Sequence, residues 1–457
     1  MSTYRRLFIL LGLVLTLAVP GVDCVLAQTY NADDNTILKQ IIIFGRHSIR
    51  SATSDNATLD QMATTPYPAF SVQPGYLTPR GREAAALLGA YFRQYLLQEG
   101  LLTGNNEKDA AHSYFRSNSI ERSYETAAAF QGSLIPNSTQ AVHSFPPGQV
   151  DPVFDPTKAG VAKIDTDRAV KEAQALFNGS DALKSAYSAE FSLIRNVLFD
   201  NSDPPLGKID PTAPPIPLTA TTETSVGTFI DVGGLQETNA AADPFIMQYA
   251  DNFDFPDKVA WGRLTLDQIS QQTRITNLIF EIEVRSPYLG RVQSSNAASH
   301  ILRTMEQAVT GAQVPGAFCS PKRSRTVVVI SSDGYVAGVA GLLKLHWQLP
   351  GYQPDFCAPG GALVFELRQK KVSKQYVVRV YYTAQSLDQL RQLAALTPAN
   401  PPETIQLLIP GGGSSSKSSS NLDVDFDTFH RLLTDAIGIQ YVENPSQEVR
   451  PGVLTLQ

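Results

Sequence analysis

One short segment places an imidazole between two guanidinium groups: Arg46-His47-Ser48-Ile49-Arg50. Imidazole is a competent nucleophile toward phosphorus, and guanidinium has the planar donor fork that fits phosphate oxygens. Phosphoryl transfer through a histidine would require this combination of one nucleophile and several arginines. Taken alone, the segment is equally compatible with a solvated turn whose arginines pair with surface carboxylates.

The residues before this segment indicate where it lies in the fold. Residues 38–44 end in four consecutive apolar side chains, a pattern typical of a buried strand. In an α/β sheet, ligands bind at the carboxyl ends of the strands, and the histidine segment follows such an end directly. Because burying an unpaired charge is costly, we expect the arginines to remain without a partner until an anionic ligand binds.

Strand and helix patterns alternate at both ends of the chain. Thr78 and Pro79 are typical of a helix start, as N-cap and first-turn residue. We expect strands at 112–116 and 326–330, helices at 120–130, 335–343 and 386–396, and an antiparallel strand pair at 362–368 and 375–382. The pattern predicts an α/β fold: a mainly parallel sheet with helices on both faces and antiparallel edge strands.

The middle of the chain has a different pattern. Helical periodicity dominates from about residue 167 to residue 310, and a proline-rich stretch, 203–218, interrupts it. We predict a smaller helical domain at 161–310, inserted into an α/β core formed by 28–160 and 311–457.

The N-terminus has the features of an export signal. Two arginines precede the apolar run 7–19, and small residues at positions 25 and 27 fit a cleavage site before Gln28. Residues 1–27 are therefore predicted to be a signal peptide, and the mature chain to be periplasmic or secreted. A membrane anchor is the alternative, but the run is short for a span and Pro20 breaks it.

Composition limits the partners. The net charge of −6 and the pI near 5.6 disfavour a general nucleic-acid binder, so an anionic substrate would need a local cationic pocket. After residue 27 only Cys319 and Cys357 remain. In an oxidising compartment these two residues predict one disulfide, with two buried thiols as the alternative.

Several segments together resemble one family. The histidine segment resembles the RHGxRxP signature of the histidine acid phosphatases, in the branch of bacterial periplasmic phytases and glucose-1-phosphatase. Segments at 77–81, 118–130, 151–156, 345–351 and 359–366 are similar to further blocks of that family, in the same order. Each motif is weak alone, but the ordered set extends from about residue 38 to residue 436. The resemblance therefore disfavours the solvated turn.

The resemblance implies a phosphomonoesterase that acts on small phosphorylated substrates, such as inositol or sugar phosphates, without cofactor or metal. His47 would attack phosphorus and form a phosphohistidine, and Asp333 would protonate the leaving alkoxide. The phosphate oxygens would be held by Arg46, Arg50, Arg122 and Ser332, and the substrate would also contact Thr53, Asn118 and Arg291.

The sequence departs from the family pattern at the acid. The family has a histidine before the acid, and Ser332 stands there in this chain. A hydroxyl can donate one hydrogen bond, but it is shorter than imidazole and never cationic. This departure supports an alternative: a catalytically weakened or inactive phosphate-ester binding protein. The presence of both His47 and Asp333 argues against that alternative, because a binding protein needs neither a nucleophile nor an acid.

Overall fold

The computed structural model describes residues 35–213, 219–220, 230–231, 234–413 and 422–444. The predicted signal peptide and its cleavage site lie outside these residues. Within the described part of the chain, no helix is both long and apolar enough to cross a membrane.

The centre of the molecule is one mixed sheet with strand order β2-β5-β1-β6-β7-β8, and β9 also pairs with β7. Strands β2, β5 and β1 are parallel, and the others are antiparallel to their neighbours. The strands are β1 Thr36–Arg46, β2 Ser113–Ser117, β5 Thr326–Ser331, β6 Ala362–Lys370, β7 Tyr376–Ala384, β8 Glu403–Gln406 and β9 Val424–Asp425. The predicted α/β fold with a parallel core is confirmed. The predicted antiparallel pair β6–β7 also forms, but it does not lie at the edge of the sheet. Strand β6 lies beside β1 inside the sheet, and β8 is the edge strand on that side.

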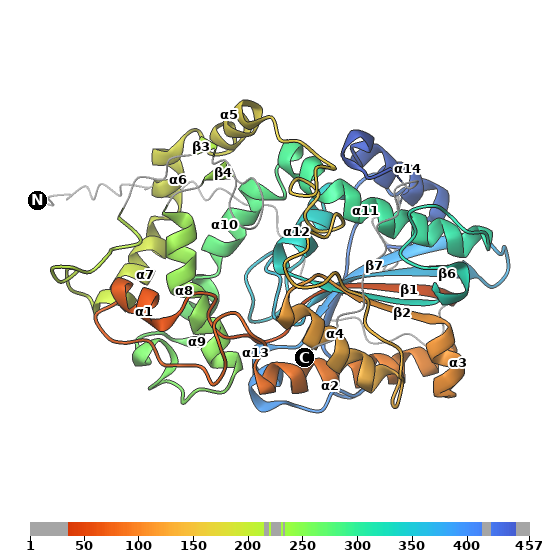
Figure 1. Ribbon diagram of the computed structural model, residues 1–457, viewed down its shortest axis with the longest axis horizontal. Helices are drawn as coiled ribbons and strands as arrows, with labels where there is room; N and C mark the ends of the chain where they lie inside the picture. Colours follow the sequence, from red (N-terminus) through yellow and green to blue (C-terminus); the bar gives the residue numbers. More distant parts are fainter. Residues whose placement is uncertain (1–34, 214–218, 221–229, 232–233, 414–421, 445–457) are drawn as a thin grey trace, which may run out of the picture.

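Helices cover both faces of the sheet (Figure 1). Both faces need a cover because the apolar side chains of β1 point alternately to one face and to the other. Ile41 and Ile43 enter one hydrophobic core, and Ile42 and Phe44 enter the other, because successive side chains of a strand point to opposite faces. The first core includes α2 Pro79–Gln98 and α4 Glu121–Leu134, and the second includes α11 Pro287–Thr310, α12 Asp333–Leu342 and α14 Phe426–Ala436. The predicted helix start at Thr78 is confirmed, since its side chain accepts a hydrogen bond from the Gly81 amide.

A group of helices lies beside the sheet, in yellow and green in Figure 1. It contains α5 Thr166–Phe177, α6 Ser180–Ala186, α7 Ser188–Phe199, α8 Leu235–Ala250, α9 Leu266–Gln271 and α10 Arg274–Glu283, with a two-stranded sheet of β3 Thr219–Ala220 and β4 Ile230–Asp231. Helix α11 contacts α5 and α10 of this group and also α12, α14 and β1 of the core. The domain boundaries at 161 and 310 therefore stay predictions.

Short helices complete the fold. They are α1 Asn56–Leu59, α3 Asn106–Ala111 and α13 Leu387–Gln392, with 3₁₀ turns at Asp60–Met62, Val259–Gly262, Pro321–Arg323 and Ile439–Tyr441.

The predicted disulfide is wrong, because Cys319 and Cys357 are both buried free thiols in the structure. The carbonyl of Cys319 accepts from Gln307 before β5 begins, whereas the carbonyl of Cys357 accepts from Arg46 at the end of β1. The two cysteines thus lie near opposite ends of the parallel strands. A strand the length of β5 spans about 20 Å, and a disulfide requires Cα atoms within about 7 Å.

Candidate active site

The carboxyl edge of the parallel strands brings the predicted residues together. Arg46 ends β1 and lies in register with Ser331, the last residue of β5, so Asp333 follows at the same edge. Strand β2 ends beside them, where the Asn118 amide donates to the carbonyl of Ile330. Helix α4 begins at the same edge and carries a third arginine in its first turn. We define the active-site cluster as these residues together with Asp243, which pairs with Arg50: Arg46, His47, Arg50, Arg122, Asp333 and Asp243.

His47 is held in one orientation. Its Nδ1 lies 2.8 Å from the carbonyl oxygen of Ser48. A carbonyl only accepts, so Nδ1 carries the hydrogen and Nε2 keeps its lone pair. Burial, and then the charges of the three neighbouring arginines, hold the pKa of His47 well below its usual value. The side chain is therefore a neutral imidazole with a nucleophilic Nε2 at neutral pH.

Arg46 is fixed from three sides. One terminal nitrogen donates to the carbonyl of Cys357, and the other lies 3.0 Å from Oδ2 of Asp333. The guanidinium carbon is 5.8 Å from the ring centre of Phe356. These contacts connect the candidate phosphate-binding arginine to the candidate acid, and they place both at the end of β1.

Arg50 pairs with a residue that the sequence did not reveal. Its guanidinium lies 2.9 Å from Oδ2 of Asp243, which α8 contributes from the helical group. The expectation that the arginines lack partners is therefore wrong for Arg50, as it is for Arg46. One signal in the sequence could have found Asp243, because it is the only charged residue between positions 238 and 250.

The loop that carries Arg50 is anchored on helix α2. The Thr78 amide donates to the carbonyl of Ile49. A side chain at Gly81 would collide with that same carbonyl oxygen, so the helix can approach the loop this closely only with glycine there. The block at 77–81 thus positions the second arginine.

Arg122 completes the cationic side of the cluster. One terminal nitrogen donates to the carbonyl of Gly75 at 3.1 Å. Burial, followed by the charge of Arg50, lowers its pKa to about 10, so the guanidinium is still cationic at neutral pH. While both carboxyl groups are ionised, the cluster has three guanidinium groups against two carboxylates and a neutral imidazole, which leaves one positive charge in surplus.

Three further predicted site residues, Ser332, Asn118 and Thr53, lie near the cluster in the chain and differ in burial and hydrogen bonding. Ser332 occupies the N-cap position of α12 next to Asp333, and its side chain makes no capping hydrogen bond. Asn118 is buried at the same edge, and its Nδ2 has no hydrogen-bond partner in the described part of the chain. Thr53 is exposed in the loop after Arg50.

The structure does not bring Arg291 to the cluster. Its guanidinium donates to the carbonyls of Asp435 and Ile437, at 3.3 and 3.1 Å. Those carbonyls end helix α14, where a cation compensates unsatisfied acceptors. The contacts of Arg291 indicate a structural role.

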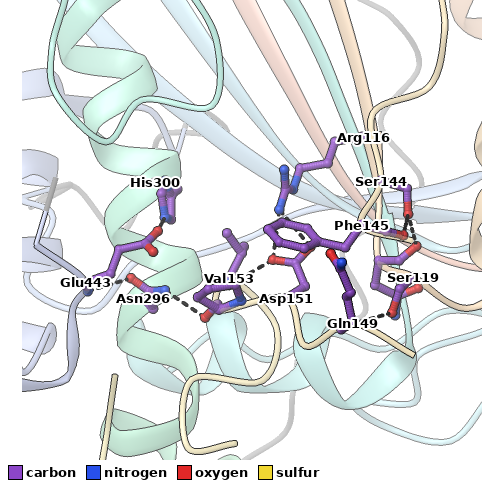
Figure 2. Close-up of polar contacts among 12 residues, drawn as sticks. Arg116, Ser119, Ser144, Phe145, Gln149, Asp151, Val153, Asn296, His300 and Glu443 are labelled. Atoms are coloured by element: carbon purple, nitrogen blue, oxygen red, sulfur yellow. Dashed lines mark hydrogen bonds and ion pairs between the residues drawn. The ribbon is translucent and has the colours of Figure 1, made fainter. Parts of the chain in front are cut away.

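The block at 151–156 contacts the helix that begins with the candidate acid, Asp333. Asp151 accepts from Arg116 of β2 at 2.7 and 2.8 Å, and from the amide of Val153 at 3.0 Å (Figure 2). Asp155 then accepts at 2.9 Å from the hydroxyl of Tyr335, two residues after Asp333. This buried pair and the hydrogen bond between Asp155 and Tyr335 fix the start of α12, a role that the resemblance of this segment did not predict.

Among the residues that the structure describes, no group of three or more His, Cys, Asp or Glu side chains is arranged to hold a metal ion.

Known proteins share this architecture. The family model described as the histidine phosphatase superfamily, branch 2, matches residues 37–206 and 245–383. The chain is 27% identical to phytase AppA of Escherichia coli strain K12 over 383 residues, which are 82% of this chain and 87% of that one. It is 26% identical to a glucose-1-phosphatase of Providencia rettgeri over 398 residues, or 84% and 89% of the two chains. A solved Hafnia alvei phytase in complex with tartrate superposes with a TM-score of 0.79 at 27% identity, covering 90% of this chain and all of that one, 100%.

Proposed function

The chain belongs to the histidine phosphatase superfamily, branch 2, and on that premise we propose that it hydrolyses small organic phosphate monoesters through a phosphohistidine on His47. The relatives are enzymes, and at the coarser level the chain is a phosphomonoesterase of the histidine acid phosphatase type. One observation carries the finer proposal: a buried, neutral imidazole with a free Nε2 lies among three arginines and beside a carboxyl group.

In the first step, Nε2 of His47 attacks phosphorus in line with the ester oxygen that leaves. The hydrogen bond from Nδ1 to Ser48 orients the ring and stabilises the positive charge that the imidazole gains. Arg46, Arg50 and Arg122 hold the equatorial oxygens, where charge is concentrated in the transition state.

Asp333 acts in both steps. In the first step its protonated form donates a proton to the leaving alkoxide, which is a poor leaving group without one. In the second step the resulting carboxylate accepts a proton from the water that attacks the phosphohistidine, which releases phosphate and restores the imidazole. The ion pair with Arg46 and the hydrogen bond from the Gly334 amide, at 3.0 Å each, hold the carboxyl group at the edge of the phosphate site.

The second candidate is a weakened or inactive phosphate-ester binding protein. Ser332 supports it, because the hydroxyl provides less charge stabilisation than the imidazole that the family pattern has there. Thr53 and Asn118 remain candidate substrate contacts under either function. The sequence of residues 1–27 also supports export of the chain, to the periplasm or the medium.

One experiment tests the covalent step. The protein is mixed with ³²P-labelled substrate and quenched in alkali, because phosphohistidine is labile in acid. We expect label on the protein, and we expect His47→Ala to abolish both labelling and turnover. Retained turnover in a folded His47→Ala variant would refute the covalent mechanism. Tight binding of phosphate esters by the parent, without turnover, would favour the binding protein.

A further inference from the structure

The charges in and around the active-site cluster bear on the leaving group of the substrate. The cluster itself has one positive charge in surplus while Asp333 and Asp243 are both ionised, and two when Asp333 carries the proton that it donates. A single phosphate monoester has a charge of about −1.5 to −2 at neutral pH, which already offsets that surplus. Any further phosphate on the substrate would need additional cations outside the cluster.

Three cations near the cluster, in the described part of the chain, already have carboxylate neighbours. On the side of α4, Arg82 pairs with Glu125, and Glu121 lies within electrostatic reach of both. On the side of the 151–156 block, Lys158 lies within electrostatic reach of Asp155. The cations on these two sides face at least as many carboxylates.

The helices on the other sides continue this pattern. Arg285, whose charge reaches Cys357 beside the cluster, pairs with Glu281 at 2.7 Å and Asp355 at 3.5 Å. Helix α8, which contributes Asp243, contains no Lys or Arg at all. Helix α8 therefore presents a carboxylate, that of Asp243, and no cation to the cluster.

An aromatic side chain lies next to the candidate acid. Gly334 follows Asp333, and a Cβ atom there would lie 3.5 Å from Cε1 of Phe280, on α10. Phe280 is partly buried and packs against the core. An aromatic face packs well on the apolar face of a sugar or aryl ring, and it offers no attraction to an anion.

We infer that the substrate is a monophosphate ester whose leaving group carries no further phosphate, such as a sugar monophosphate, and that inositol polyphosphates are poor substrates. The inference rests on the function proposed above and names its substrate class. The cluster binds one phosphate, Phe280 packs against an uncharged ring beside Asp333, and the surrounding carboxylates repel further phosphate groups.

The first test compares kcat/KM of the full chain for glucose 1-phosphate and inositol hexakisphosphate at low salt. Electrostatic repulsion in a cleft changes association by about 10–10³-fold, so we expect a preference of about 10² for the monophosphate. Added sodium chloride should reduce the preference, because salt screens the repulsion. Equal or faster hydrolysis of the hexakisphosphate would overturn the inference.

If neither ester is hydrolysed, the phosphomonoesterase proposal fails, and calorimetry of ester binding decides the inference separately. Tighter binding of the monophosphate would support it, and tighter binding of the hexakisphosphate would refute it.

The second test removes one carboxylate from the layer. Oε2 of Glu121 accepts a hydrogen bond from the Leu77 amide at 3.0 Å, and Glu121→Gln keeps an oxygen acceptor for that amide. At about pH 7, where carboxyl groups are ionised, the variant should raise the ratio of hexakisphosphate to monophosphate kcat/KM by about 3–10-fold. Glu107→Gln is the matched control, because Glu107 is exposed on α3 before β2 begins. An unchanged ratio in Glu121→Gln, or an equal rise in the control, would refute the charge argument.

Discussion

Replacing Asp243 with asparagine tests whether the helical group takes part in the site. The substitution keeps the shape of the side chain and removes the charge that faces Arg50. The two side chains are 11% and 8% exposed, and their charged atoms are 2.9 Å apart, so water screens the pair only weakly. A phosphate group bound by Arg50 would meet this carboxylate, and Asp243 should therefore oppose anion binding.

The size of the effect follows from Coulomb's law. Two unit charges about 6 Å apart, at an effective dielectric constant of about 20, repel each other by about 2.8 kcal/mol. That energy corresponds to about a factor of 100 in an equilibrium constant. We therefore expect Asp243→Asn to lower the inhibition constant of inorganic phosphate about 100-fold. Without phosphate, the variant should be less stable by about 2–4 kcal/mol, because Arg50 is then buried without its carboxylate.

Two measurements check this prediction. Competitive inhibition of p-nitrophenyl phosphate hydrolysis gives the inhibition constant, and thermal unfolding with and without phosphate gives the stability. Phosphate should stabilise the variant more than the parent, by linkage. Asp254→Asn is the control, since Asp254 is 71% exposed in its pair with Lys258. If phosphate inhibits Asp243→Asn no better than the parent, Asp243 does not oppose the anion and the reasoning fails.

Three further predictions concern Asp333, Ser332 and His47. Asp333→Asn should slow hydrolysis of alkyl phosphates far more than that of p-nitrophenyl phosphate, whose leaving group needs little protonation, and equal losses in kcat would indicate a structural role. Ser332→His should raise kcat more than it changes KM, by up to about 10²-fold, because a donor aimed at transition-state charge is worth about 10²–10³ in rate; a stable variant with no gain on any monoester would contradict this. The lowered pKa of His47 means that the unfolded chain binds a proton below about pH 6.5 that the folded chain does not bind, so stability present above that pH is lost as the pH falls. Urea unfolding should show this loss in the parent and less of it in His47→Asn, and equal pH dependence in both would show that His47 does not contribute.

Local patterns were sufficient for most of the fold. The apolar run before Arg46 predicted β1, because a strand buried on both faces needs apolar side chains in succession. Thr78 and Pro79 predicted the start of α2, because capping depends on residues adjacent in the chain. Helix α11 shows the limit of such patterns. Its periodicity indicated a helix, but which of the two structural units it contacts depends on packing.

The disulfide prediction failed for a geometric reason. Compartment and cysteine count favoured a bridge, but they contain no distance. The two thiols lie near opposite ends of the parallel strands, and only the sheet topology shows this. For Arg291, the family resemblance implied a contact with the substrate, whereas in the structure its guanidinium donates to the carbonyls at the end of α14.

By itself, the sequence determined the reactive groups of this protein: His47, the arginines and Asp333 are recognisable because their chemistry depends on residue type and on position after a strand. Only the tertiary structure decided the charge balance of the site. Asp243 lies on a helix, 193 residues after Arg50 in the chain, and no local pattern specifies such a contact. Asp243 therefore removes one positive charge from the surplus that the residues predicted from the sequence would have, because contacts between residues far apart in the chain are determined by folding and not by their order along the chain.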